Sequence, residues 1–358
     1  MKDPIYFHRT ELADKLIYNL KGGITHALTL FAPRRMGKTQ FLLNDVKPQA
    51  EKNGFNVFYF SFFDQMGDVQ TSFTVALQAF LNDVSSSGGK TLKRVNRIDV
   101  MGVGIGLQDE QSHPFLSISQ LINELAQKSD KPVLMLLDEV QELARIKGTE
   151  QMVKSLRTGL DINQNQVKVI FTGSSTNGLR AMFNDNKAAF FHFAHPLDFP
   201  NLGKDFIEFL AGIYQQRTNK ILDTDLLYHY FERFHFSPLY LRAVIQDMIL
   251  NPTLSLEVAA EYRLTQVDEN SENRQAWLQL SELERLILLA VLNGETAIYS
   301  KGTRQFFADK LGLENISTST IQGKVRKLER AELLTRNVGG TLKINNVYFK
   351  TWLRENVN

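Results

Sequence analysis

LTLFAPRRMGKTQFLL, residues 28–43, holds an apolar run, a loop and a second apolar run in direct succession. The loop follows the phosphate-loop pattern of Gly, four residues, Gly, Lys and Ser or Thr. Ala32 stands at the first Gly, whereas Gly37, Lys38 and Thr39 are intact. Backbone N–H groups of such a loop turn inward around a polyphosphate, and the positive end of the next helix faces the same anion. The stretch therefore predicts a strand, a phosphate-binding loop and a helix.

The side chains of the loop have separate expected tasks. Lys38 is expected to reach the β- and γ-phosphates of a nucleotide, and the Thr39 hydroxyl to ligate magnesium. Gly37 tolerates the unusual dihedrals of the turn, and Ala32 is a mild departure because alanine has the next smallest side chain. The residues that we expect around the phosphates are Ala32, Pro33, Arg34, Arg35, Met36, Gly37, Lys38, Thr39 and Gln40.

A second apolar run ends in two acids. It reads KPVLMLLDEVQEL over residues 131–143, and its five consecutive apolar residues indicate a strand buried on both faces of a parallel sheet. Asp138 and Glu139 follow, at the carboxyl end of the strand, where ligands bind in such sheets. We expect Asp138 to hold magnesium and Glu139 to polarise the attacking water. A helix cap is the structural alternative, which the phosphate loop upstream disfavours.

A third apolar run, VKVIFTGSS over residues 167–175, ends in small polar residues. In ATPases of the additional-strand class, the strand beside the acidic one ends in a polar side chain near the γ-phosphate. Ser174 is the candidate for this catalytic role, with Ser175 and Thr172 as alternatives. A plain turn is the structural explanation of the same residues.

The segment before the phosphate-loop strand, residues 5–12, reads IYFHRTEL. Segments in this position often wrap the adenine in phosphate-loop ATPases. Phe7 is a candidate to stack on the base and Arg9 to anchor the loop. Packing of Phe7 in the hydrophobic core is an equally good interpretation.

Composition narrows the class of protein. The 358 residues are enough for two or three domains, and 43% hydrophobic with 22% charged residues is ordinary for a soluble globular protein. We find no apolar run long enough for a transmembrane helix and no secretory layout at the N-terminus. Both absences favour a protein without membrane association. The absence of cysteine excludes disulfides and thiolate metal sites and fits a reducing cytoplasm. A net charge of +2 is too small to argue for nucleic acid from the whole chain.

Changes in residue pattern divide the chain into three expected domains. Residues 1–200 form the nucleotide-binding core, and a boundary rich in Pro and Gly follows it. Residues 201–278 read as helices alone and predict a lid. In this lid, Ser237 and Pro238 precede a helix whose Arg242 is placed to reach the nucleotide phosphates.

Residues 279–358 predict a winged helix. Helical patterns cover residues 281–292, 303–311 and 317–328, and two short strands at 332–336 and 341–344 form the wing. Ser281 and Glu284 form a capping box. The third helix and the wing carry side chains suited to phosphate and base contacts, although protein contact or simple packing are alternatives. These side chains are Thr318, Ser319, Gln322, Lys324, Arg326, Lys327, Arg336 and Lys343.

Three further features have weaker interpretations. Residues 95–107 alternate in polarity and suggest a hairpin-like insertion. Arg157 and Arg180 are candidates for an arginine finger that acts on a neighbouring subunit of a homo-oligomer, although a solvated helix face is the more economical explanation. His192 and His195 have no acid or thiolate in their pattern, so packing or surface positions are favoured over metal binding.

APRRMGKT, VLMLLDEVQEL, VIFTGSS, SPLYLR and the terminal YFKTWLR together resemble the archaeal-type ATPase family, which is close to STAND proteins and to origin-recognition ATPases. The resemblance covers nearly the whole chain. It implies an α/β fold with a parallel-sheet P-loop NTPase core of AAA+ and ASCE type, an α-helical lid and a C-terminal winged-helix domain. It also implies ATP and Mg2+ as ligands, the phosphate and acid roles given above, and Ser174 as the polar sensor. Phe236 departs from the family pattern, because Gly is expected there before Pro238.

Two functions follow from these features. The first is a molecular switch that hydrolyses ATP, slowly or when stimulated by a partner, and passes the change through the winged helix to DNA or to a protein. The second is an ATP-binding scaffold with little hydrolysis that acts through protein partners. The intact Glu139 favours the first. A small-molecule kinase is a weaker third possibility, because it would leave the winged helix unexplained.

Overall fold

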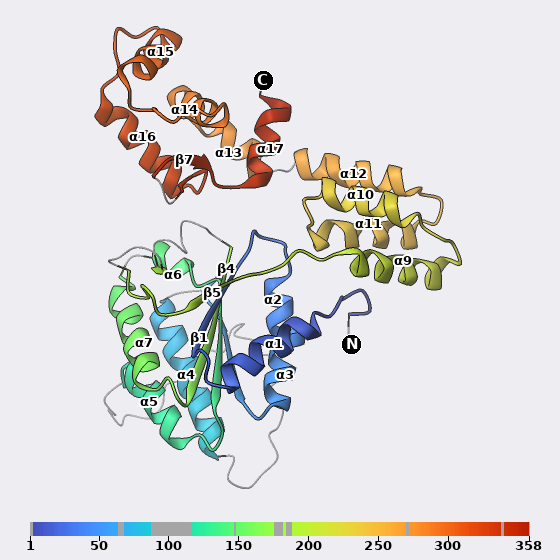
Figure 1. Cartoon of the computed structure of the whole chain (residues 1–358), viewed down its shortest axis with the longest axis vertical. Helices are drawn as coiled ribbons and strands as arrows, with labels where there is room; N and C mark the ends of the chain where they lie inside the picture. The colour runs from blue at the N-terminus through green and yellow to red at the C-terminus, as the bar shows by residue number, and fades with distance from the viewer. Residues whose placement is uncertain are drawn as a thin grey trace.

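The computed structural model describes residues 3–63, 68–86, 116–146, 148–174, 182–183, 188–269, 272–337 and 340–357. The expected insertion over residues 95–107, Arg180 and Ser175 lie outside these residues. Within them, an α/β part, a group of helices and a C-terminal part with a small hairpin follow one another along the chain (Figure 1).

The α/β part contains α1 (Thr10–Lys21), β1 (Ala27–Phe31), α2 (Lys38–Phe41), the π-helical turn η1 (Leu42–Val46), α3 (Lys47–Lys52), β2 (Asn56–Ser61), α4 (Val69–Ser86), α5 (Ile118–Lys128), β3 (Val133–Asp138), α6 (Glu142–Arg145), α7 (Glu150–Ile162), β4 (Val167–Gly173) and β5 (His195–Asp198). The helices that follow are α9 (Lys204–Thr218), α10 (Thr224–Arg233), α11 (Pro238–Leu250), α12 (Leu256–Glu269) and α13 (Glu272–Leu278). The C-terminal part contains α14 (Glu282–Leu292), α15 (Lys301–Leu311), α16 (Thr318–Arg330), β6 (Leu334–Arg336), β7 (Leu342–Ile344) and α17 (Val347–Asn356).

Within the described residues, β1 to β5 form one sheet in the order β2-β3-β4-β1-β5. Every neighbouring pair is parallel, and β4 lies between β1 and the acid-bearing β3. The register places Phe31 beside Gly173, and Ser61 beside Asp138. The carboxyl ends of these strands therefore meet at one edge. The parallel-sheet core predicted from the buried apolar runs is confirmed.

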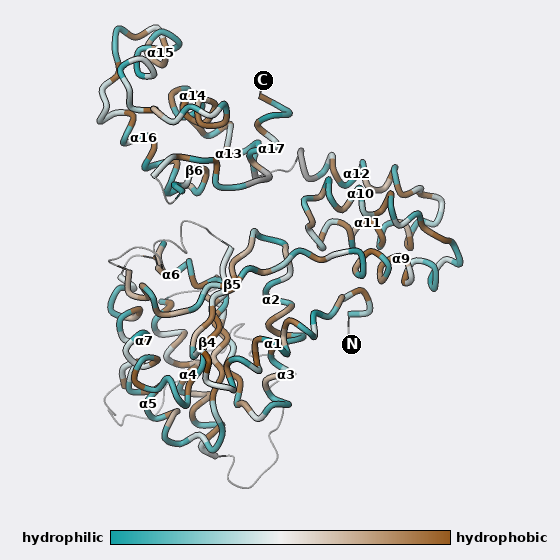
Figure 2. The backbone as a smooth tube through the Cα atoms, in the orientation of Figure 1, coloured by the Kyte–Doolittle hydropathy of each residue, from teal (hydrophilic) through white to brown (hydrophobic). Residues whose placement is uncertain are grey.

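Alternate side chains of the interior strand β3 enter two separate hydrophobic cores. Val133, Met135 and Leu137 pack with apolar residues of α4, α5 and α7. Leu134 and Leu136 pack with α1 and with the helical run from α2 to α3. Figure 1 shows the two helix groups on opposite faces of the sheet, and Figure 2 shows the apolar strands between them. Burial on both faces explains why β3 reads as a continuous apolar run.

The strand β5 was not expected from the sequence. It pairs with β1, with His195 opposite Leu28, and it lies at the edge of the sheet. Pro196 lies inside it, and an edge strand tolerates a residue that has no N–H to donate. The strand is short and mostly exposed, so it lacks the buried apolar run that revealed its neighbours.

The helix predicted after the phosphate loop is present and contains a π-helical turn. α2 leads directly into the π-helical turn η1 and then into α3, without a break in the helical run. A π-turn widens the helix by one residue per turn and is frequent at functional sites. Here it carries Asp45, whose side chain is buried.

The helices α9 to α12 share a hydrophobic core built around Phe206, Phe231 and Leu241. The turn before α11 departs from the expected Gly, as the sequence indicated. Phe236 nevertheless takes the left-handed conformation that favours glycine, with φ of 58°. It retains ring contact with Phe231 at 5.4 Å, which gives the side chain a packing role that glycine could not fill.

The C-terminal part has the element order expected for a winged helix. α14, α15 and α16 are followed by the antiparallel hairpin β6–β7, and all share one core with α17. The predicted capping box is present, with the Ser281 N–H donating to Glu284 Oε2 at 2.8 Å. In the described parts of the chain, no helix combines the length and the apolar content that crossing a bilayer requires.

Candidate functional site

A cavity of about 480 Å³ lies where the carboxyl ends of the strands face α9 and α11. Its size is within the range of small-ligand sites. Most of the residues expected at the nucleotide line it: Phe7, Arg9, Arg34, Arg35, Met36, Gly37, Lys38, Thr39, Gln40, Asp138, Glu139 and Arg242. Sequence reasoning missed a further group of lining residues: Tyr6, Ser61, Phe63, Leu202, Phe206, Pro238 and Leu239. Most of these are apolar or aromatic, and none has a side chain that by itself indicates nucleotide binding.

The phosphate loop is folded around its own lysine. Lys38 is 5% exposed, and its Nζ donates to the carbonyls of Ala32 and Pro33 at 2.7 and 2.9 Å. Ala32 and Pro33 therefore enter the site through their backbone. Gly37 has φ of 89° and Arg35 has φ of 68°, so two residues of the turn occupy the left-handed region. Burial lowers the pKa of Lys38, although the nearby Glu139 and Asp138 oppose this change.

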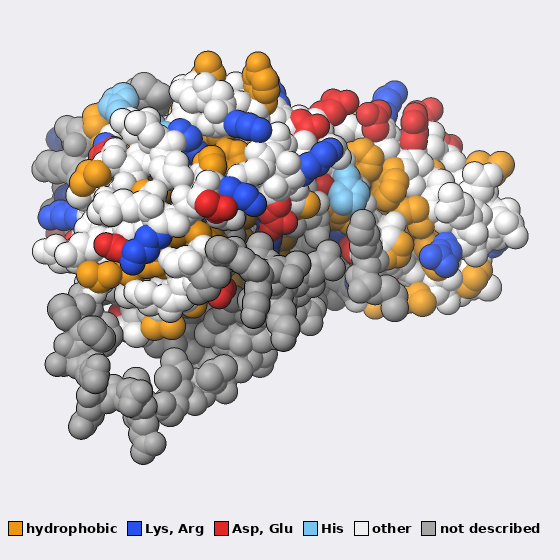
Figure 3. All heavy atoms as spheres, turned by 90° about the horizontal axis from the view of Figure 1, so that it is seen from below, with side chains coloured by type: hydrophobic (Ala, Val, Ile, Leu, Met, Phe, Trp, Pro, Cys, Tyr) orange, Lys and Arg blue, Asp and Glu red, His pale blue; other side chains and the backbone are white. Residues whose placement is uncertain are grey.

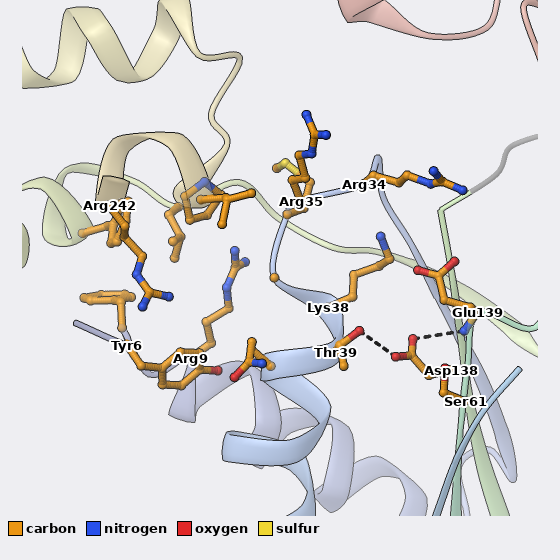
Figure 4. Close-up of a pocket in the computed structure, with 18 of the residues that line it drawn as sticks. Tyr6, Arg9, Arg34, Arg35, Lys38, Thr39, Ser61, Asp138, Glu139 and Arg242 are labelled. Atoms are coloured by element: carbon orange, nitrogen blue, oxygen red, sulfur yellow. Dashed lines mark hydrogen bonds between the residues drawn. The ribbon is translucent and has the colours of Figure 1, made fainter. Parts of the chain in front are cut away.

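Thr39 and Asp138 meet at the edge of the cavity, as expected. The Thr39 Oγ1 hydroxyl donates to Asp138 Oδ2 at 2.6 Å, and Asp138 is 1% exposed (Figure 4). Thr172, which was an alternative sensor, donates its hydroxyl to Asp138 Oδ1 instead. A hydroxyl and a carboxylate at this separation are hard oxygen ligands of the kind that magnesium binds, together with phosphate and water. The donor set fits the implied metal.

Glu139 follows Asp138 in an unusual backbone conformation, with φ of 53°. Its carboxylate lines the cavity and lies on the side of Lys38 in Figure 4. Ser174 does not line the cavity; its hydroxyl donates to Glu139 Oε2 at 2.9 Å. The structure therefore brings Ser174 to the acid, and its expected contact with a γ-phosphate stays a prediction.

The N-terminal segment is anchored to the core by Asp45, a contact that the sequence did not reveal. The buried Asp45 carboxylate accepts the Tyr6 hydroxyl at 2.6 Å, His8 Nδ1 at 2.6 Å and the Arg9 N–H at 3.1 Å. Burial, together with the bond to Asp45, raises the pKa of Tyr6. An acid inside the apolar helix LLNDV was the available signal. The anchor holds Tyr6 and Arg9 along one side of the cavity (Figure 4), and Phe7 between them in the chain also lines it.

Phe7 and Arg9 both join the cavity to neighbouring structure. Phe7 makes edge contacts with Phe206 and Phe209 of α9 at 5.7 and 5.3 Å. It is therefore part of a core and a lining residue at once. The Arg9 guanidinium lies 4.2 Å from the centre of the Phe199 ring and donates to the Pro200 carbonyl. Burial lowers the pKa of Arg9 to about 10.

The helix α11 contacts the site directly. Arg242 pairs with Asp3 of the N-terminal segment, and it points into the cavity from the side of α11 (Figure 4). The Ser237 hydroxyl donates to the Arg35 carbonyl at 3.3 Å, and the Arg35 guanidinium lies 5.3 Å from the Tyr240 ring. These contacts tie the phosphate loop to the helices that follow the core.

Two other predicted features lie away from the cavity. Arg157 is engaged within its own chain, because it pairs with Asp161 at 2.6 Å and donates to the Ala189 carbonyl at 2.9 Å. His192 and His195 are both exposed, as favoured from the sequence. Among the described residues, no group of three or more His, Cys, Asp or Glu side chains is placed to hold a metal.

Comparison with known families identifies the chain. Residues 7–230, more than half of it, match the model of a family described as an ATPase domain predominantly from Archaea. The chain belongs to this ATPase family. The resemblance drawn from the phosphate loop, the acidic strand and the polar strand is thereby confirmed. No match to a curated protein is found.

Solved structures show the same fold for this ATPase over its whole length. The Walker-type ATPase of Pyrococcus abyssi is 18% identical, with a TM-score of 0.62 over 98% of this chain and 96% of that one. The ORC2 protein of Aeropyrum pernix in its ADP form is 14% identical, with a TM-score of 0.61 over 99% of this chain and 96% of that one. At these identities the likeness concerns the fold alone.

Proposed function

We propose that the cavity binds ATP with Mg2+, that the chain hydrolyses ATP, and that the nucleotide state controls the C-terminal part. The bond between Thr39 and Asp138 carries the proposal, because it brings together two predicted magnesium ligands, one from the start of α2 and one from the end of β3. We also propose the domain bounds 1–200 for the core, 201–278 for the lid and 279–358 for the winged helix.

In this proposal, Lys38 exchanges the carbonyls of Ala32 and Pro33 for the β- and γ-phosphates. A full negative charge attracts the ammonium more strongly than a carbonyl dipole does, so the exchange is favourable. Arg34 and Arg35 add positive charge on the same side of the cavity. Bound ATP thus draws the loop residues toward its phosphates.

Thr39 and Asp138 hold Mg2+, which supplies positive charge against the phosphate oxygens when it is bound. Glu139 takes a proton from the attacking water, and Ser174 supports its carboxylate. Phe7 lines the cavity and stacks on the base of the nucleotide. Arg9 anchors the N-terminal segment through its bond to the Pro200 carbonyl.

Arg242 couples the lid to bound ATP. It is paired with Asp3, a residue of the N-terminal segment, and it lines the cavity. A triphosphate offers more negative charge than one carboxylate, so ATP competes with Asp3 for Arg242. The differential contact between ATP and the lid is what a nucleotide switch requires.

A route from the acid to the C-terminal part runs through α6. This helix begins shortly after Glu139, and its Arg145 pairs with Glu142 at 2.7 Å and with Glu332 at 2.6 Å. Glu332 lies between α16 and β6, the elements expected to contact a partner. Both Arg145 and Glu332 are partly exposed, and pairs of this kind are weak enough to be broken and remade.

The partner of the C-terminal part is DNA in the first version of the proposal. Ser319, Gln322 and Arg326 are exposed on α16, as a reading helix requires. The face in Figure 3 is seen from below, away from the C-terminal part at the top of Figure 1, and it mixes both signs of charge. The net charge of the chain is only +2, so the proposal rests on α16 and on Lys343 of the wing.

A scaffold that acts through proteins is the second candidate, and one observation favours it. Lys324 and Lys327, both expected at DNA, bond to the buried Glu284 carboxylate at 3.1 and 2.9 Å. Arg336 of the wing pairs with Glu329 at 2.8 Å. A helix whose charges are partly compensated inside its own domain suits a protein surface better than a phosphate backbone.

The deciding experiment measures ATP hydrolysis with and without duplex DNA at low and moderate salt, beside the Glu139→Gln variant. DNA-stimulated turnover that weakens steeply with salt supports the DNA switch, because phosphate contacts are salt-dependent. Tight ATP binding without turnover or DNA response supports the scaffold. Glu139→Gln retains binding and loses turnover by about 100-fold or more if Glu139 is the base.

Coupling to the C-terminal part has its own readout. The chain has two tryptophans, Trp277 and Trp352, and their rings lie 6.4 Å apart in the hydrophobic core of the C-terminal part. ATP bound to Glu139→Gln should therefore change the intrinsic fluorescence, and the further substitution Arg145→Gln should reduce that change. Equal changes with and without Arg145 would refute the route through α6.

A further inference from the structure

Gln141 is fully buried two residues after Glu139, and its Nε2 donates to Glu139 Oε2. We propose that Gln141 is a positioning residue that holds the Glu139 carboxylate in the orientation needed to activate water. The inference rests on the proposed ATPase function and deepens it. It concerns a residue that no motif in our sequence analysis assigned to the site.

The orientation of the Gln141 amide follows from its neighbours. A flipped amide would direct Oε1 at the Glu139 carboxylate, and two acceptors repel each other. With Nε2 toward Glu139, Oε1 is buried and finds no donor among the described residues. An unpaired buried acceptor is unfavourable, and a methionine of similar length would avoid it. The polar group is therefore explained by the bond that its N–H makes.

The end of β4 is shaped to receive this amide. A Cβ atom at Gly173 would clash with Gln141 Oε1 and would lie 2.5 Å from Phe31 Cε1. Any side chain at position 173 would therefore displace the Gln141 amide from its position beside Glu139. Because the amide lies against Gly173 and bonds to Glu139 and Ser174, it is held in place before any ligand arrives, which is the condition for a preorganised site.

The two donors to Glu139 act on the same oxygen. Ser174 Oγ and Gln141 Nε2 both contact Oε2, and the Ser174 hydroxyl lies 3.4 Å from the Gln141 amide. Oε1 is left for a water molecule in the cavity. Lys38 attracts Glu139 across the cavity and would draw a loosely held carboxylate toward itself. Gln141 opposes that movement.

The test compares Gln141→Met with Gln166→Met. Gln166 also uses its amide for hydrogen bonds, to the Lys131 and Ser129 carbonyls, but at the amino end of the sheet, away from the cavity. Gln141→Met should bind ATP within about twofold of the wild type and lose about 10- to 100-fold in kcat, a part of what a positioned base contributes. Gln166→Met should leave both unchanged.

The pH profile separates positioning from a structural role. A structural role would lower kcat by the same factor at every pH, whereas a positioning role should change how kcat depends on pH in Gln141→Met. Gln141→Glu keeps the shape and donates only when protonated. It should retain more turnover than Gln141→Met at acidic pH and lose it as the pH rises.

Each outcome decides the inference. If the wild type hydrolyses ATP and both Gln141 variants keep its kcat and profile, the inference fails and the proposed function stands. If the wild type neither binds nor hydrolyses ATP, the proposed function fails and the inference falls with it. If Gln141→Met does not fold, Gln141→Glu decides alone, and a profile like that of the wild type contradicts positioning.

Discussion

Lysines serve opposite purposes in the cavity and in the C-terminal part. In the cavity, Lys38 meets the carbonyls of Ala32 and Pro33, whose partial charges leave its positive charge uncompensated by direct bonding. In the C-terminal part, Lys324 and Lys327 share one buried carboxylate, Glu284. The first arrangement keeps a cation ready for an anion. The second uses two cations of α16 to bind α14 through Glu284. A helix that is basic in sequence therefore need not present a basic surface.

Lys38→Ala tests the cavity side of this comparison and has the largest expected effect. Removal of the ammonium should weaken ATP binding by about 100-fold, or about 3 kcal/mol, because the phosphates lose their closest full charge. Titration calorimetry with the exposed Lys52→Ala as control measures this. Unchanged affinity for ATP would refute the assignment of the loop.

Glu284→Gln tests the C-terminal side of the comparison, where two lysines are bound to a buried carboxylate. The amide keeps the size of the side chain and removes the charge that Lys324 and Lys327 share, which should lower the free energy of unfolding by about 2 kcal/mol. Urea unfolding followed by tryptophan fluorescence reports this region, because Trp277 and Trp352 belong to the same core. The neighbouring Glu282, which is exposed, supplies the control Glu282→Gln. Equal midpoints for the two variants would contradict the prediction.

The same carboxylate predicts how stability depends on pH. Burial alone would raise the pKa of Glu284, but the bonds from Lys327, Ser281 and Lys324 outweigh it and hold the pKa at about 2. The folded-state pKa lies below the unfolded value, so this contribution is fully present above pH 4.5 and is lost as the pH falls toward 2. Unfolding curves at neutral and acidic pH should show the stability difference between wild type and Glu284→Gln shrinking. A constant difference would argue against the low pKa.

The smallest expected effect concerns DNA. Arg326→Ala should weaken binding to duplex DNA and reduce the salt slope by about 1, because an exposed cation can neutralise one phosphate. Lys324→Ala should change DNA binding less, and should lower stability instead, because its ammonium is already bonded to Glu284. Fluorescence anisotropy at several salt concentrations compares the two. Equal losses of DNA affinity would show that the compensated lysine is still available.

Local patterns were enough for the parts of the site that lie within one turn or one strand end. The phosphate loop is formed by consecutive residues, so Gly37, Lys38 and Thr39 identify it from the sequence alone. The buried strand before Asp138 shows itself because both of its faces are covered and each residue must be apolar. The capping box of Ser281 and Glu284 was also predictable, because its two members are only three residues apart in the sequence.

The tertiary structure decided every contact between side chains that lie far apart in the chain. Asp45 holds Tyr6 from 39 residues away, and Glu284 binds Lys324 from 40 residues away. Gln141 can reach Glu139 because Gly173 of β4 leaves room for its amide. The strand β5 exists because it pairs with β1. The sequence by itself determined which groups can bind phosphate and magnesium, because that chemistry belongs to single residues. Which charges remain available to a ligand depends on partners that only folding brings together.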